Sequence, residues 1–176
     1  RDRIALGAFW LRRARRLAPP LLLLLLVLGG VRLFLPPSLA QAWRADILAA
    51  LTYTTNWWEI AQSGDYFAQF GPESPVLHTW SLAIEEQYYL LFAVFMAVVA
   101  RRRVGRRWLL VLLLVATGVS IATMYRSTTS GDLAWAYYGT VPRLQALLIG
   151  AMLAVLLRAG PGPAVLEKWR DPAGVL

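Results

Sequence analysis

Long apolar segments, separated by shorter polar or basic stretches, dominate the pattern of this sequence. Four of them are long enough to cross a bilayer: residues 17–35, 75–100, 108–125 and 138–157. An α-helix rises about 1.5 Å per residue, so roughly 20 apolar residues cross a hydrocarbon core of about 30 Å. The pattern therefore predicts an all-α, polytopic transmembrane protein with four spans.

The connection between the first two spans, residues 36–74, is long for a plain loop. Within it, residues 45–60 (ADILAALTYTTNWWEI) predict a helix that is too short and too polar to span comfortably. Trp57 and Trp58 suit the depth of the lipid headgroups. We therefore expect an interfacial or re-entrant helix here, followed by an ordered loop over residues 62–75.

The basic residues agree with four crossings. The net charge is +8, and 14 of the 18 Lys and Arg residues lie in three clusters beside the apolar segments. Four crossings place these clusters, within residues 1–16, 101–107 and 158–176, on one side of the membrane, which the positive-inside rule makes the cytoplasmic side. Such placement favours a lipid bilayer as the partner and excludes nucleic acid, which requires basic residues gathered on one solvated face.

Other features of composition narrow the chemistry. Cysteine is absent, which excludes disulfides, thiolate metal sites and cysteine nucleophiles, and a single His excludes a histidine-rich metal site. We therefore predict no metal. The chain starts with Arg1 rather than Met, so we expect residues 1–176 to be part of a longer membrane domain.

The second span carries an unusual polar stripe. At about 100° per residue, His78, Ser81, Glu85 and Tyr89 fall within an arc of roughly 80°, and Glu86 flanks it. Ionisable groups at such depth usually face a protein or aqueous interior, where a carboxylate can act as an acid, a base or an orienting group. We predict a catalytic stripe; the alternative is a polar cluster that only joins helices.

The reverse face of the same helix is expected to meet lipid. It is interrupted only by Gln87. Its other members are small or aliphatic side chains: Ala83, Leu90, Leu91 and Val94.

Five residues are candidates for binding. Arg13 and Arg16 share a helix face at the start of the first span, and guanidinium pairs suit the phosphates of a nucleotide-bearing donor; topogenic charge is the alternative reading. Asn56, Glu86 and Arg143 are candidate substrate contacts, although Arg143 is also placed to snorkel to the outer interface.

Three stretches, in this order along the chain, resemble the acyltransferase-3 family of bacterial membrane O-acyltransferases. FWLRRARRLAPP resembles its Arg-x-x-Arg segment before a Pro, matched by Arg13 and Arg16. HTWSLAIEEQYYLL resembles its Ser-Leu-x-x-Glu-x-x-x-Tyr motif, matched by Ser81, Leu82, Glu85 and Tyr89. YYGTVPRLQALLIGAMLA is similar to the segment that enters a later span, especially in the subgroup fused to an SGNH-hydrolase-like domain. The last stretch departs from the family at Val141 and Pro142, where relatives often carry Asp-Thr.

The resemblance implies an enzyme of the bacterial plasma membrane that uses acyl-CoA as a co-substrate, with no bound cofactor. It implies transfer of an acyl group, with acetyl expected, to a hydroxyl of a cell-surface carbohydrate or related acceptor. It also implies a catalytic His upstream of Arg1, so we expect this chain to be inactive alone. The residues by themselves leave open a proton-coupled transporter or flippase that uses Glu85, and a non-catalytic membrane scaffold.

Overall fold

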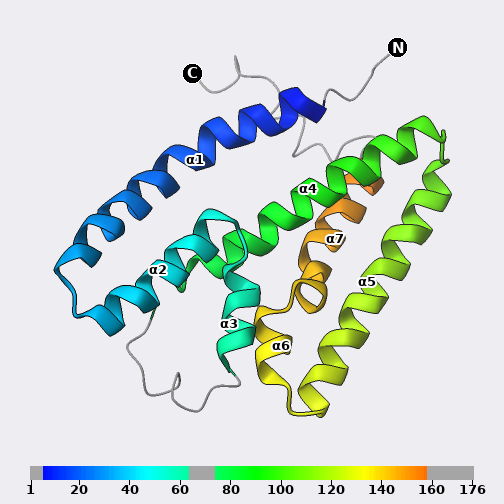
Figure 1. Cartoon of the computed structure of the whole chain (residues 1–176). Coiled ribbons are helices and arrows are strands. Elements are labelled where there is room, and N and C mark those ends of the chain that lie inside the picture. Colours follow the sequence, from blue (N-terminus) through cyan, green and yellow to red (C-terminus); the bar gives the residue numbers. More distant parts are fainter. Residues whose placement is uncertain (1–5, 64–73, 158–176) are drawn as a thin grey trace, which may run out of the picture.

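The computed structural model describes residues 6–63 and 74–157, and the predicted all-α architecture is confirmed in these residues (Figure 1). Most of the predicted loop over residues 62–75 and all of the basic tail at 158–176 lie outside the described residues.

The four predicted spans are confirmed. They are α1 (Leu6–Val31), extended by the short 3-10 helix η1 (Arg32–Phe34); α4 (Thr79–Arg101); α5 (Arg106–Thr129); and α6 with α7 (Leu133–Tyr138 and Thr140–Leu157). Each is long and apolar enough to cross a membrane. Four such helices are typical of a multi-pass membrane protein.

The first span starts earlier than predicted. Arg and Ala are strong helix formers, so α1 is already helical at Leu6, the first described residue, and the basic cluster over residues 12–16 lies within it. Pro19 and Pro20 therefore lie inside the helix and do not open it. Helices in membranes tolerate such prolines because neighbouring groups satisfy the freed carbonyl oxygens.

Packing is closest between α5 and α7, with α4 against them. The core of this unit contains Tyr88, Val99, Leu109, Leu113 and Leu148. The start of α1, the α4–α5 hinge and the end of α7 lie at the upper end of Figure 1, while the α5–α6 turn lies at the lower end. The start of α1 and the basic hinge are thus toward the same end of the molecule.

The connection after α1 corrects the prediction of one helix over residues 45–60. It forms α2 (Pro37–Leu51) and α3 (Thr55–Ser63), separated by a turn at Tyr53, which has the positive φ of 54°. The Thr52 hydroxyl contacts the carbonyl oxygen of Leu48 at 2.9 Å, and Thr54 donates its backbone N–H to Ala49 O at 2.8 Å. Threonines that bond to the last carbonyls of a helix compete with its continuation, so the helix stops here.

The path of α2 places this turn deep in the molecule. α2 runs back alongside α1 (Figure 1), and its 15 residues cover about 22 Å. Leu21 and Leu25 of α1 are buried in one cluster with Ala50 and Val76, against which Tyr53 packs. Relative to α1, the α2–α3 unit is therefore re-entrant.

Candidate functional site

An ion pair joins the basic start of α1 to the polar stripe of α4. Arg13 Nε donates to both carboxylate oxygens of Glu86, at 2.7 and 2.9 Å, and an Nη lies 2.6 Å from Oε1. The guanidinium carbon lies 3.6 Å from the centroid of the Tyr89 ring, a close cation–π contact. Glu86 and Tyr89 are three residues apart on a helix and so share a face. Two of the predicted binding residues, Arg13 and Glu86, are thus partners of one another.

Beside this pair lies an open groove of about 420 Å³ with a cationic wall. Arg12 and Arg16, four residues apart on α1, face Glu85 and Tyr89 of α4 across it. The side chains of Arg12, Arg16 and Glu85 are exposed, and no ion pair links them among the described residues. The structure therefore brings together the predicted Arg16, Glu85 and Tyr89, and adds Arg12.

His78 and Ser81 lie at the start of α4, before Glu85 and outside the groove. His78 is exposed and immediately precedes the helix, and Ser81 Oγ donates weakly to its carbonyl oxygen at 3.4 Å. Seven residues of helix, about 10 Å, separate His78 from Glu85. The predicted stripe therefore occupies one face of α4, but only Glu85 and Tyr89 of its four members line the groove.

The reverse face of α4 differs from the prediction. Ala83 is completely buried, and Gln87 lies in the interior, because α3 and α7 pack against this side. Leu90, Leu91 and Val94 are exposed, as expected of a face that meets lipid. The apolar face is thus divided: its first turns contact protein, and only the later turns are free.

Gln87 is the centre of a buried polar junction. Its Nε2 donates to Tyr53 O at 2.9 Å and to Asn56 Oδ1 at 3.0 Å, and its Oε1 accepts from the Thr140 hydroxyl at 2.6 Å. Asn56 is fully buried and donates to Tyr138 O at 3.1 Å and Thr140 Oγ1 at 3.0 Å. Both donors of Asn56 are therefore used in joining α3 to α6 and α7, which favours a structural role over the predicted substrate contact.

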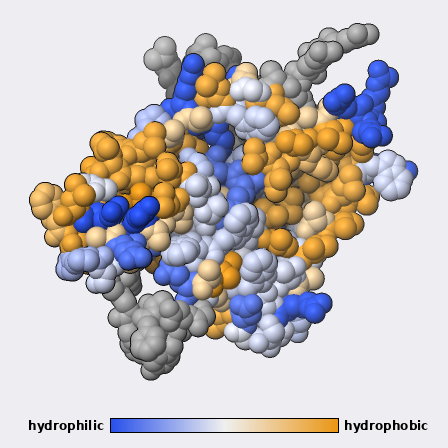
Figure 2. All heavy atoms as spheres, in the orientation of Figure 1, coloured by the Kyte–Doolittle hydropathy of each residue, from blue (hydrophilic) through white to orange (hydrophobic). Residues whose placement is uncertain are grey.

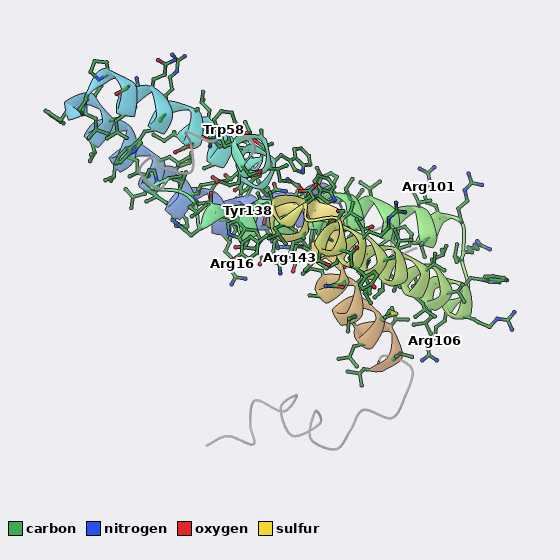
Figure 3. The ribbon with its side chains drawn as sticks, turned by 90° about the horizontal axis from the view of Figure 1, so that it is seen from below. Arg16, Trp58, Arg101, Arg106, Tyr138 and Arg143 are labelled. Carbon is green, nitrogen blue, oxygen red and sulfur yellow. The ribbon has the colours of Figure 1, made fainter. Side chains whose placement is uncertain are left out.

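Arg143, another predicted substrate contact, lies in an aromatic cluster at the start of α7. Its Nε donates to Tyr137 O at 2.9 Å, and its guanidinium lies 4.7 Å from the Tyr137 ring and 5.6 Å from the Trp80 ring. Figure 3 shows it far from Arg101 and Arg106, which mark the basic end of α4 and α5. Arg143 is thus held at the end of the molecule opposite the α4–α5 hinge.

The structure shows two neighbouring carboxylates that the sequence did not indicate as part of the site: Asp46 on α2 and Glu59 on α3. Asp46 is only 6% exposed and accepts a hydrogen bond from Trp58 Nε1 at 2.9 Å. Burial, and secondarily the negative charge of Asp46, raise the pKa of Glu59 to about 6. The three residues lie in the segment predicted as one interfacial helix, in which the sequence indicated only Asn56, Trp57 and Trp58 as notable positions.

The polar residues of these sites gather in the middle of the molecule. In Figure 2 a hydrophilic band runs between the hydrophobic surfaces of α1 and α2 on one side and of α4, α5 and α7 on the other. A membrane protein with ionisable groups between its helices usually places them along a substrate path.

Comparison with known proteins identifies relatives. The model of a family described as "Acyltransferase domain" matches residues 1–162. The O-acetyltransferase OatA of Staphylococcus aureus (strain NCTC 8325 / PS 47) is 40% identical over 158 residues, covering 88% of this chain and 26% of the relative. The protein SACOL0978 of S. aureus strain COL is 40% identical over 187 residues, covering 98% of this chain and 29% of the relative. The chain thus spans about a quarter of the length of these relatives. No solved structure matches it.

Proposed function

This chain belongs to the acyltransferase-domain family, and from that premise we propose that it is part of a membrane O-acyltransferase. The enzyme transfers an acyl group from acyl-CoA to a hydroxyl of a cell-surface carbohydrate or related acceptor. The name of the relative OatA, an O-acetyltransferase, supports acetyl as the group transferred.

The observation that carries this proposal is the groove beside α1. Two exposed guanidinium groups, Arg12 and Arg16, line it from one side, and the Glu85 carboxylate lines it from the other. Guanidinium groups bind phosphate oxygens in pairs, so the groove suits the phosphates of the donor. Arg13 is already paired with Glu86, so we assign the donor contacts to Arg12 and Arg16, with Arg13 supporting the wall between them.

The chemistry of the proposed reaction gives Glu85 its role. The acceptor oxygen forms a bond to the carbonyl carbon of the thioester, the carbon–sulfur bond breaks, and sulfur leaves as a thiolate that takes up a proton. A base must remove the proton of the acceptor hydroxyl. In the proposal a His upstream of this chain is that base, and Glu85 orients it or balances its positive charge.

The positions of the basic residues suggest how the protein is oriented in the membrane. The donor groove lies beside the basic residues of α1, and the start of α1 lies toward the same end of Figure 1 as the α4–α5 hinge. We propose that this end faces the cytoplasm of a bacterium, where acyl-CoA is made, and that the acceptor is reached from the other side of the plasma membrane.

The experiment is acetyl transfer from labelled acetyl-CoA to a polysaccharide acceptor by membranes that contain the complete protein. Glu85→Gln should abolish transfer while the amount of inserted protein is unchanged. Arg16→Ala should raise the KM for acetyl-CoA, whereas the matched control Arg102→Ala, an exposed arginine in the hinge, should not. Full turnover by Glu85→Gln would refute the role of Glu85, and an unaltered KM in Arg16→Ala would refute the donor site.

A further inference from the structure

We propose that an open chamber between α1, the α2–α3 turn and α4 binds the acyl group of the donor, with the Trp10 indole N–H donating to the thioester carbonyl oxygen. The inference rests on the proposed function and adds to it the place where the acyl group is recognised.

The chamber has a volume of about 320 Å³ and mostly aromatic and aliphatic walls. These walls include Trp10, Tyr53, Trp57, Tyr89 and Leu90. Sites for small molecules are typically apolar concavities with a few well-placed polar groups. The chamber fits that description, because the re-entrant turn at Tyr53 lies beside α1 and α4 and leaves a concave space between them.

Trp10 supplies a polar group that the fold itself does not use. Its Nε1 is buried and has no hydrogen-bond partner among the described residues. A buried indole N–H usually finds a partner, and one without calls for an explanation. By contrast, other polar side chains of the chamber are engaged: Gln87 in the buried junction and Trp57 with the Thr140 hydroxyl at 3.0 Å.

The charge of the chamber selects a neutral ligand group. The Glu86 carboxylate lines it, and the Arg13 guanidinium that neutralises this carboxylate is already held by it. A phosphate placed here would meet an acidic oxygen and no uncommitted guanidinium. A carbonyl oxygen, which is neutral and only accepts hydrogen bonds, suits the indole donor.

The chamber adjoins the donor groove. Arg13 and Tyr89 line both spaces, so the ion pair and the ring stacked on it form a shared wall. One ligand can therefore place its phosphates against Arg12 and Arg16 and its uncharged end beside Trp10. An acyl thioester of a phosphate-bearing carrier has this combination of groups.

The test compares the dissociation constants of acetyl-CoA and CoA for the complete protein. Both ligands have the same phosphates, so the ratio of the two constants isolates the acyl group. In the wild type we expect acetyl-CoA to bind about fivefold more tightly, the value of one ordinary hydrogen bond. Trp10→Phe keeps an aromatic wall but removes the donor, so it should bring the ratio close to one and leave CoA binding unchanged. Trp108→Phe, an exposed position on α5, is the matched control and should keep the wild-type ratio.

A second variant tests the chamber without changing Trp10, in case Trp10→Phe impairs folding. Leu90→Trp fills the chamber from α4 and should weaken acetyl-CoA binding but not CoA binding, whereas Leu91→Trp, the more exposed neighbour, should change neither. If Trp10→Phe and Leu90→Trp both keep the wild-type ratio of dissociation constants and the protein still transfers acetyl, the chamber does not bind the acyl group. The proposed function then remains intact. A wild type that binds neither ligand and transfers no acetyl group overturns both.

Discussion

Glu86→Ala should expose how strongly α1 is tied to α4, because the substitution leaves the Arg13 guanidinium without its anionic partner. Arg13 makes two hydrogen bonds to the carboxylate, at 2.7 and 2.9 Å, and charge-assisted hydrogen bonds contribute about 1.5–3 kcal/mol each. Breaking a fully buried pair costs about 3–5 kcal/mol. The side chains of Arg13 and Glu86 are 22% and 18% exposed, so they remain partly solvated by water. We therefore expect Glu86→Ala to lower the free energy of unfolding by about 2–3 kcal/mol.

A double-mutant cycle separates the pair from its surroundings. Arg13→Ala also loses the stacking on Tyr89, whereas the double variant leaves no charge unpaired, so the two single losses should exceed the combined loss by about 1.5 kcal/mol. The measurement is the free energy of unfolding of the complete protein in detergent. Glu85→Ala, the adjacent exposed carboxylate, is the control and should change stability by less than about 0.5 kcal/mol. A coupling energy below about 0.5 kcal/mol would show that the ion pair does not hold the helices together.

Two more predictions concern the interior and the α2–α3 unit. Gln87→Leu should cost about 2–4 kcal/mol of unfolding free energy, because it leaves Asn56 Oδ1 and the Tyr53 carbonyl oxygen without partners; a loss no greater than that of Leu91→Ala would contradict the structural role of the junction. Glu59 has a raised pKa of about 6, so stability should fall as pH rises from about 4.5 to 6, where the folded protein loses its extra proton. Glu59→Gln should remove that fall and, after discounting for partial exposure, stabilise the protein by about 1 kcal/mol at pH 7.5 and by nothing at pH 4.5. Identical pH profiles for the two proteins would refute the prediction.

The membrane spans could be predicted from the sequence because few backbone conformations are stable inside a bilayer. A long apolar segment must form a helix to satisfy its own hydrogen bonds, so runs such as residues 108–125 define elements without knowledge of their neighbours. Helical periodicity likewise placed Glu85 and Tyr89 on one face, which the structure bears out at the groove. These features depend only on local sequence.

Features that depend on contacts between distant segments could not be predicted in the same way. Arg13 and Glu86 are 73 residues apart, and nothing in either segment specifies the other as its partner. Periodicity gave α4 an apolar face but did not reveal that α3 and α7 cover its first turns, so it predicts Ala83 on the lipid face and Gln87 as a break in that face. Gln87 was nevertheless a usable signal, because a lone amide on an apolar face needs partners in the interior.

The pairing of Arg13 with Glu86 also bears on how the protein is made. Residues are added to a growing chain at about 5–20 per second, so the 73 residues between the two delay the carboxylate by roughly 4–15 s. During that interval Arg13 has no counter-ion, and an arginine within the bilayer costs about 2.5–3.5 kcal/mol. The Arg13 guanidinium therefore gains its carboxylate partner only after α4 has been made, and the contact between α1 and α4 forms at that later stage.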